Sequence, residues 1–178
     1  MPAFERLGGE EVWRGRVASV RVDRFRHEDG EEVSREIVSH PGAVAVLAHD
    51  GERLYVVAQP REAVGEPALV ELPAGKLDEQ GEDPLATAKR ELAEEIGKGA
   101  RTWRHMKTFY SSAGFSDEEI HVYLATDLYD AHAETDENER IEVQAVPLDR
   151  LDDAIAASQD AKSLIGLLWF RAYRDRGP

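Results

Sequence analysis

Apolar and charged residues alternate over the stretch from about residue 11 to residue 39. A polar turn at 27–30 interrupts the alternation and ends in a glycine. Alternation with a period of two is typical of half-buried strands, and a glycine-bearing turn between two such runs favours a hairpin. The pattern therefore predicts an antiparallel hairpin or small sheet near the N-terminus. Its apolar positions are Val17, Val20, Val22, Phe25, Val33, Ile37 and Val38.

Short apolar runs and helical segments fill the rest of the chain. Strands are predicted at about 43–48, 54–59, 68–73, 103–110, 119–126 and 141–147, and C-terminal helices at roughly 149–157 and 160–174. Strands interspersed with one central helix and terminal helices indicate an α/β fold, an α/β/α sandwich around a mixed sheet. Because a two-stranded piece is only marginally stable alone, the N-terminal β extension, 1–40, must pack on its own domain, 41–178, or on a partner.

One helix in the middle of the chain is specified at both ends. Asp83 suits the N-cap, and Pro84 suits the first helical position, where no amide hydrogen is needed. Gly97 is suited to end the helix in a left-handed conformation. At roughly 100° per residue, one stripe is apolar and a separate face is acidic. The stripe is Leu85, Ala88, Leu92 and Ile96, and the acidic residues are Glu91, Glu94 and Glu95.

The acidic face has two interpretations that the spacing alone leaves open. As a solvated surface it gains an i,i+4 pair between Glu94 and Lys98, about 0.2–0.5 kcal/mol, while Glu91 and Glu95 repel at the same spacing. As a metal site it offers carboxylate oxygens, which Mg²⁺ prefers, and the ion keeps waters that leave room for substrate phosphates.

Composition limits the classes of function. A chain of 178 residues is long enough for one catalytic domain with a small extension. It contains no cysteine, which excludes disulfides, thiolate zinc sites and cysteine nucleophiles. The formal net charge is −14 and there is no long apolar run. We therefore expect no nucleic-acid partner, no membrane span and a cytoplasmic location.

The stretch from Gly75 to Lys98 resembles a Nudix box. Glu82 stands eight residues before Arg90, where the sequence Arg-Glu-x-x-Glu-Glu-x-Gly begins, as in the box pattern. Two positions depart from it, because six residues instead of five separate Gly75 from Glu82, and Lys98 stands at an apolar position. The extra residue predicts a bulge around 78–81, and neither departure touches the carboxylates.

Sequence outside the box resembles the ADP-ribose pyrophosphatases of the Nudix superfamily. The segments that carry this resemblance are His40-Pro41-Gly42-Ala43-Val44-Ala45-Val46-Leu47, Gln59-Pro60-Arg61, Glu71-Leu72-Pro73-Ala74-Gly75 and Gly114-Phe115-Ser116-Asp117-Glu118. These enzymes usually carry a proline before the last segment, where this chain has Ala113. That departure bears on the ADP-ribose assignment more than on the superfamily.

The resemblance implies metal-dependent hydrolysis of the pyrophosphate bond of ADP-ribose to AMP and ribose 5-phosphate. Mg²⁺ is the expected ion, with Mn²⁺ as the alternative. Arg90 would orient the box glutamates, since a guanidinium fork suits carboxylates, and Glu118 would orient or deprotonate the attacking water. The implied metal ligands are Glu91, Glu95, Glu94 and the carbonyl of Ala74.

Three further residues are candidates for substrate binding. The resemblance implies that Arg61 faces the substrate phosphates and places Glu71 beside the box entry. Trp13 is a candidate for stacking on the adenine, because aromatic faces bind bases, and the N-terminal extension would be exchanged across a homodimer. The alternatives are a surface ion pair for Arg61 and burial against the hairpin for Trp13.

Other functions remain open. One is a Nudix pyrophosphatase for another nucleoside diphosphate derivative, such as a sugar nucleotide, NADH or a dinucleoside polyphosphate. Another is an inactive Nudix module that binds a nucleotide, against which the complete set of glutamates argues. A structural or interaction protein finds no support beyond the acidic composition.

Overall fold

The computed structural model describes residues 3–77, 82–131, 133 and 140–174. It divides into two compact units, which are described separately below. The first contains Met1–Gly42 and Tyr110–Glu119, and the second contains Ala43–Phe109 and Ile120–Pro178. The predicted bulge around 78–81 lies outside the described residues.

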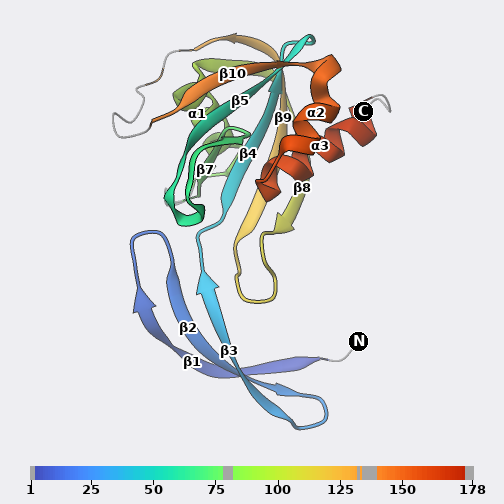
Figure 1. Ribbon diagram of the computed structural model, residues 1–178. Coiled ribbons are helices and arrows are strands. Elements are labelled where there is room, and N and C mark those ends of the chain that lie inside the picture. The colour runs from blue at the N-terminus through green and yellow to red at the C-terminus, as the bar shows by residue number, and fades with distance from the viewer. Residues whose placement is uncertain (1–2, 78–81, 132, 134–139, 175–178) are drawn as a thin grey trace. The chain divides into compact units, whose positions relative to one another are not determined.

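The first unit is built on a three-stranded antiparallel sheet of β1 (Phe4–Arg14), β2 (Ser19–His27) and β3 (Glu32–Ser39) (Figure 1). The strands β2 and β3 form the predicted hairpin. The strand β1 begins earlier than the alternation indicated, at Phe4. Its register shifts between Arg6 and Gly8 and again between Glu11 and Trp13. Each such irregularity breaks the period-two pattern, so sequence reasoning placed only its last part.

The second unit contains a seven-stranded mixed sheet. Its strands are β4 (Ala43–His49), β5 (Arg53–Arg61), β6 (Glu66–Glu71), β7 (Ala74–Lys76), β8 (Lys98–Tyr110), β9 (Glu119–Asp130) and β10 (Glu142–Pro147). The order is β10-β5-β4-β9-β8, with β6 on β5 and β7 on β4. The pair β4 and β9 is parallel, while β4 pairs antiparallel with β5 and β7. The mixed sheet was predicted, but the three-residue strand β7 was not.

Helices cover both faces of this sheet. The helix α1 (Pro84–Ile96) packs on one face, and α2 (Leu151–Ala157) and α3 (Ala161–Tyr173) lie on the other (Figure 1). Short 3₁₀ turns are η1 (Glu62–Val64) and η2 (Leu148–Arg150). No helix in the described part of the chain is long and apolar enough to cross a membrane.

The central strand β4 explains why two layers of helix form. Its side chains alternate between the faces, so that Val44 and Val46 join the α1 core while Ala45 and Leu47 join the α3 core. All four are fully buried. An apolar run buried on both faces needs a cover on each side, and the expected α/β/α sandwich is confirmed.

Candidate active site

The helix α1 begins and ends where the sequence predicted. Gly97 follows its last residue with φ 65°, the left-handed conformation that glycine adopts without strain. Asp83 occupies the N-cap, but its side chain makes no capping hydrogen bond. Its backbone carbonyl instead accepts hydrogen bonds from the N–H groups of Ala86 and Thr87.

Arg90 lies at the centre of the acidic face. Its Nη1 donates to Glu91 Oε1 at 2.8 Å and to Glu94 Oε2 at 3.1 Å, and its Nη2 lies 3.3 Å from Glu82 Oε2. Burial alone lowers the pKa of Arg90, but the hydrogen bond to Glu82 and the surrounding negative charges outweigh it, and the pKa is raised. The guanidinium therefore stays charged and holds these carboxylates as a group.

Glu95 turns from the acidic face towards the sheet. Only 8% of the residue is exposed, which corrects the expectation that the whole acidic cluster lies outside the buried stripe. Its Oε2 accepts a hydrogen bond of 2.9 Å from the backbone N–H of Ala74 in β7. A buried carboxylate needs such a donor, and the unpredicted strand β7 supplies it.

Glu91 lies against Gly75, the residue that follows Ala74 in β7. A Cβ atom built on Gly75 would lie 2.0 Å from Glu91 Cδ and 2.0 Å from Glu91 Oε1. The carboxylate thus occupies the space that any other residue at position 75 would fill. Gly75 belongs to the sequence motif, but its contact with Glu91 depends on the pairing of β7 with β4 and was not predicted.

The donors on α1 suit a divalent cation by their chemistry. They are carboxylates, the ligands that hard cations prefer, and β7 positions two of them, Glu91 through Gly75 and Glu95 through Ala74. Among the described residues no three Asp, Glu, His or Cys side chains already form a metal-binding group.

Arg61 and Glu71, which the sequence analysis proposed for substrate binding, contact each other. Arg61 Nε and Nη2 donate to Glu71 Oε1 and Oε2 at 2.6 and 2.8 Å. Lys162, from the first turn of α3, binds Glu71 Oε2 at 2.5 Å. The side chain of Glu71 is 1% exposed, that of Lys162 13% and that of Arg61 41%. Sequence reasoning did not single out Lys162.

Both cations keep Glu71 ionised. Burial raises the pKa of this carboxyl, but the hydrogen bonds from Arg61 and the charge of Lys162 outweigh it, so that the pKa lies below its ordinary value. The hydrogen bonds to Glu71 raise the pKa of Arg61, and the charges of Glu95 and Asp160 add to that rise. Arg61 is therefore electrostatically coupled to the helix α1 as well as to α3.

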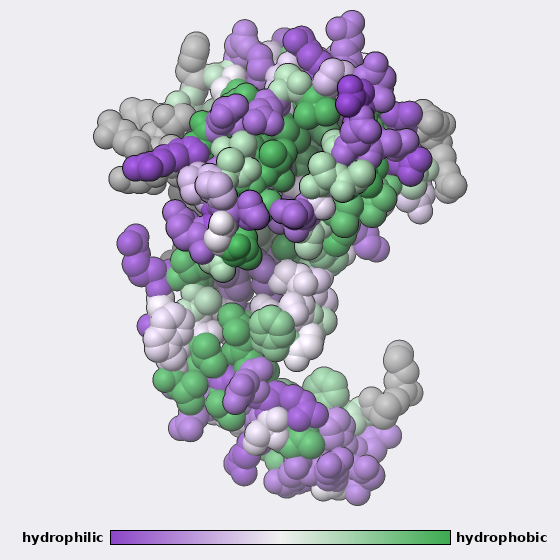
Figure 2. All heavy atoms as spheres, viewed as in Figure 1, coloured by the Kyte–Doolittle hydropathy of each residue, from purple (hydrophilic) through white to green (hydrophobic). Residues whose placement is uncertain are grey.

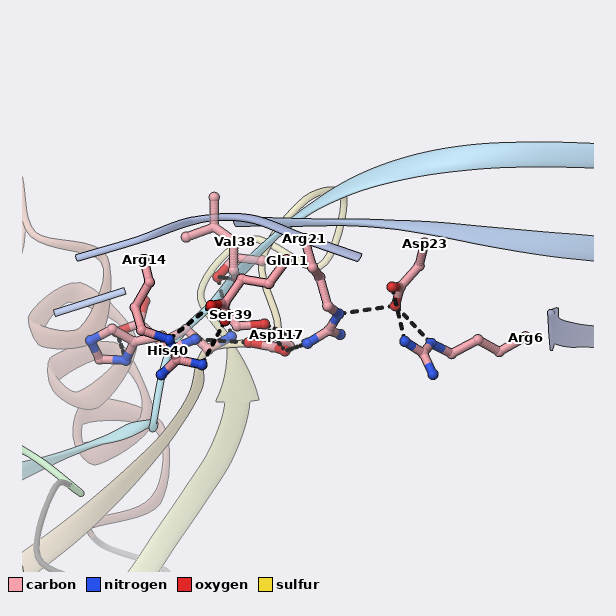
Figure 3. A network of polar contacts seen from close by, with 11 residues as sticks. Arg6, Glu11, Arg14, Arg21, Asp23, Val38, Ser39, His40 and Asp117 are labelled. Carbon is pink, nitrogen blue, oxygen red and sulfur yellow. Dashed lines mark hydrogen bonds and ion pairs between the residues drawn. The ribbon is translucent and has the colours of Figure 1, made fainter. Parts of the chain in front are cut away.

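The segment that carries Glu118 belongs to the first unit, where it is bound to the end of β3. Asp117 Oδ1 accepts a hydrogen bond from the His40 N–H at 3.0 Å, and Oδ2 accepts from Ser39 Oγ at 3.1 Å and from Arg21 Nη1 at 3.0 Å (Figure 3). Glu118 Oε1 lies 3.3 Å from His40 Nδ1. The catalytic role of Glu118 stays a prediction.

Trp13 lies on β1 and is 57% exposed. Its indole covers Gly15, where a Cβ atom would meet the ring at 2.2 Å. The ring is therefore supported by the backbone without being buried, and stacking on a base stays a prediction.

Comparisons with known proteins agree with this geometry. A sequence model of the NUDIX domain matches residues 38–167. The ADP-ribose pyrophosphatase of Bacillus subtilis (strain 168) is 44% identical over 146 residues, 80% of this chain and 78% of that protein. The methanol dehydrogenase activator of Bacillus methanolicus is 38% identical over 166 residues, 91% of this chain and 89% of that protein. The crystal structure of an ADP compounds hydrolase shares the fold, with a TM-score of 0.85 at 22% identity over 98% of this chain and 96% of that one.

The matched region contains the whole of α1 and β7 and the ion pair between Arg61 and Glu71. Hydrolases with this domain depend on divalent metal ions, in agreement with the carboxylates that β7 positions. The chain belongs to the NUDIX domain family, the Nudix hydrolases.

Proposed function

We propose that this protein is a metal-dependent pyrophosphohydrolase that cleaves ADP-ribose to AMP and ribose 5-phosphate. The observation that carries the proposal is the fixed placement of Glu91 and Glu95 against β7, by Gly75 and by the N–H of Ala74. The relative from Bacillus subtilis, an ADP-ribose pyrophosphatase at 44% identity, supports the substrate.

Glu91 and Glu95 would hold the metal, with Glu94 as a further ligand or a support for the first two. Mg²⁺ is the proposed ion because it prefers carboxylate oxygens and binds together with substrate phosphates. When bound, the ion neutralises phosphate charge and acidifies a water molecule. Arg90 keeps the carboxylates together, and the carbonyl of Ala74 is the remaining proposed ligand.

Other residues act on the substrate itself. Arg61 would bind a phosphate, since Glu71 uses only two of the five N–H groups of a guanidinium. Glu118 would accept a proton from the attacking water, a role worth about 10²–10⁴-fold in typical enzymes. Trp13 would stack on the adenine.

We also propose a homodimer in the cytoplasm. The first unit leaves aromatic side chains exposed, Phe4 at 66% and Phe115 at 57%, and a second copy would cover them. The cytoplasmic location rests on the absence of cysteine and of long apolar runs from the sequence.

The first experiment measures release of AMP from ADP-ribose by chromatography, with and without Mg²⁺. We expect metal-dependent release, and we expect Glu95→Gln to lower kcat by about 10²-fold or more while the protein still folds. Glu142→Gln, on the exposed start of β10, is the matched control and should retain activity. Near-normal turnover by Glu95→Gln would refute the assignment.

A second candidate is hydrolysis of another nucleoside diphosphate derivative. It is favoured by Ala113, which replaces the usual proline, and by the long spacing between Gly75 and Glu82. A panel of sugar nucleotides, NADH and dinucleoside polyphosphates, compared with ADP-ribose by kcat/KM, separates the two.

A further inference from the structure

We infer that Lys162 is a positioning residue for phosphate binding: it holds Glu71 so that the neighbouring Arg61 presents its charge to the diphosphate of the substrate. The inference rests on the proposed function in one respect, the contact between Arg61 and a substrate phosphate. It adds a residue on α3, far along the chain from the Nudix box, to the machinery of that site.

The geometry places Glu71 between two cations. Arg61 binds both carboxylate oxygens, and Lys162 binds Oε2 at 2.5 Å. With Arg61 alone, the carboxylate would cancel the charge of the guanidinium. Because Lys162 shares the same carboxylate, Glu71 neutralises less of the charge of Arg61 than it would alone, although Lys162 is itself paired with Asp160 at 3.0 Å. Arg61 is the most exposed of the three, so the charge is offered to a ligand at Arg61.

The position of Lys162 in α3 is not explained by the helix. It stands in the first turn, where the helix dipole disfavours a cation. Its side chain is 13% exposed, although lysine is rarely buried unless paired. Asp160 serves as the N-cap and accepts the N–H of Ser163 at 3.0 Å, and its Oδ2 lies 3.0 Å from Lys162 Nζ. The lysine is thus placed against the helix dipole, and it binds the carboxylates of Glu71 and Asp160.

The same turn of α3 also fixes the chain that leads to the box. Ser163 Oγ accepts a hydrogen bond of 2.7 Å from the N–H of Leu72, and both residues are buried. Ala74 and Gly75, which position Glu95 and Glu91, follow two and three residues later. The first turn of α3 therefore contacts both the chain that leads to β7, through Ser163, and the carboxylate that binds Arg61, through Lys162.

The test measures ADP binding to the full-length protein in EDTA by calorimetry, together with kcat and KM for ADP-ribose. Lys162→Met removes the charge at similar length, and we expect ADP to bind about tenfold more weakly and KM to rise by a similar factor with kcat much less affected. Lys162→Arg keeps the charge and should restore most of the binding. Lys107→Met is the matched control, because Lys107 is an exposed lysine on β8, outside the box, and should not affect either measurement.

A second variant answers the case in which Lys162→Met does not fold. Asn caps helices as well as Asp, so Asp160→Asn keeps the cap while releasing Lys162 to Glu71. We expect ADP to bind about threefold more tightly. Unchanged or weaker binding by this variant would overturn the inference, as would unchanged binding by a folded Lys162→Met.

The outcomes also separate this inference from the proposed function. If ADP-ribose is not hydrolysed but ADP binding depends on Lys162, the proposed reaction fails and the positioning role stands. If ADP-ribose is hydrolysed but the wild-type protein does not bind ADP, or binds it equally well after Lys162→Met, the reaction stands and the positioning role is refuted.

Discussion

Glycine residues make room for functional and structural side chains at several positions in this protein. A Cβ atom on Gly75 would lie 2.0 Å from Glu91 Cδ, and one on Gly9 would lie 2.0 Å from Asp23 Oδ1. Neither glycine has a positive φ. Their role is therefore steric, because the absence of a side chain lets a carboxylate lie directly against the backbone of a strand.

Gly75→Ala tests this close approach. The conflicting atoms are the end of a flexible side chain, so we expect the protein to fold while Glu91 is displaced. A displacement of about 1 Å at a reacting centre costs about 10²-fold in rate. AMP release should fall by that order, and the concentration of metal for half-maximal activity should rise.

The matched control is Gly99→Ala. Its new Cβ would meet the Tyr129 ring at 2.4 Å, a contact that is also far too short but involves no box carboxylate. This variant should lower Tm without changing the metal dependence. Equal metal dependence in wild-type protein and Gly75→Ala would contradict the steric role of Gly75.

Glu71 gives the protein a predictable response to acid. Its folded-state pKa lies below the ordinary value of 4.5, so its ionised form stabilises the fold at every pH above 4.5 and the contribution is lost as pH falls through the lower folded-state value. Glu71→Gln should lower the free energy of unfolding by about 1–3 kcal/mol near neutral pH. The difference from wild type should shrink below pH 4.5.

Denaturant unfolding between pH 7 and pH 3 measures this effect. Glu66→Gln, at the exposed start of the same strand β6, is the control and should follow the wild-type curve. A difference between Glu71→Gln and wild type that stays constant across the range would show that the ionised carboxylate is not the stabilising form.

At the residue scale, the sequence was sufficient to predict contacts between side chains that are spaced along one helix. Glu91, Glu94 and Arg90 lie within one turn of each other, so their proximity followed from helical geometry. The contact between Glu71 and Lys162 on α3 could not be predicted in this way, because the two residues are 91 positions apart in sequence. Contacts that depend on how distant elements pack have no local signal.

At the scale of elements, patterns with an unbroken period were predictable. The strand β4 is apolar throughout and buried on both faces, and α1 has a cap residue at each end. The strand β7 has three residues after a proline and so carries no pattern to detect. It nevertheless supplies the N–H that binds Glu95, which is why the burial of that carboxylate was missed.

Elements of the first unit are joined by Asp117, and Asp117→Asn tests the connection. The carboxylate accepts hydrogen bonds from the His40 N–H, Ser39 and Arg21 (Figure 3). Asn keeps an acceptor but loses the charge, and the side chain is 39% exposed, so we expect a loss of about 1 kcal/mol. The segment Tyr110–Glu119 should then open more often.

Hydrogen exchange at the Val38 amide reports this opening, because that N–H donates to the Phe115 carbonyl at 2.8 Å. Exchange should be faster in Asp117→Asn than in wild-type protein. The control, Asp29→Asn, alters a carboxylate that accepts the Glu31 N–H within the β2–β3 turn and should leave Val38 unchanged. Unaltered exchange at Val38 in both variants would show that the charge of Asp117 does not fix the segment.

At the scale of the whole molecule, the two units differ in how much of their apolar surface is covered. In the second unit, helices bury both faces of the sheet. The first unit is one small sheet with a segment bound at its edge, and hydrophobic residues remain visible among hydrophilic ones on its surface (Figure 2). They border a cavity of about 460 Å³ that is lined by Phe4, Phe25, Val33, Ile37, Tyr110 and Phe115, together with polar residues.

Association into a homodimer is the last prediction, and it follows from this exposed surface. Large aromatic side chains dominate interface energetics when they are buried, and Phe4 is 66% and Phe115 57% exposed within one chain. Light scattering should give twice the 19.9 kDa of one chain.

The double substitution Phe4→Glu and Phe115→Glu should reduce the mass to that of one chain, since burying charged side chains at these positions would require them to lose their water. Leu168→Glu, at an exposed apolar residue of α3 in the second unit, is the control and should leave the dimer intact. A wild-type protein of single-chain mass would refute the dimer, and a dimer that survives the double substitution would move the interface away from these two residues.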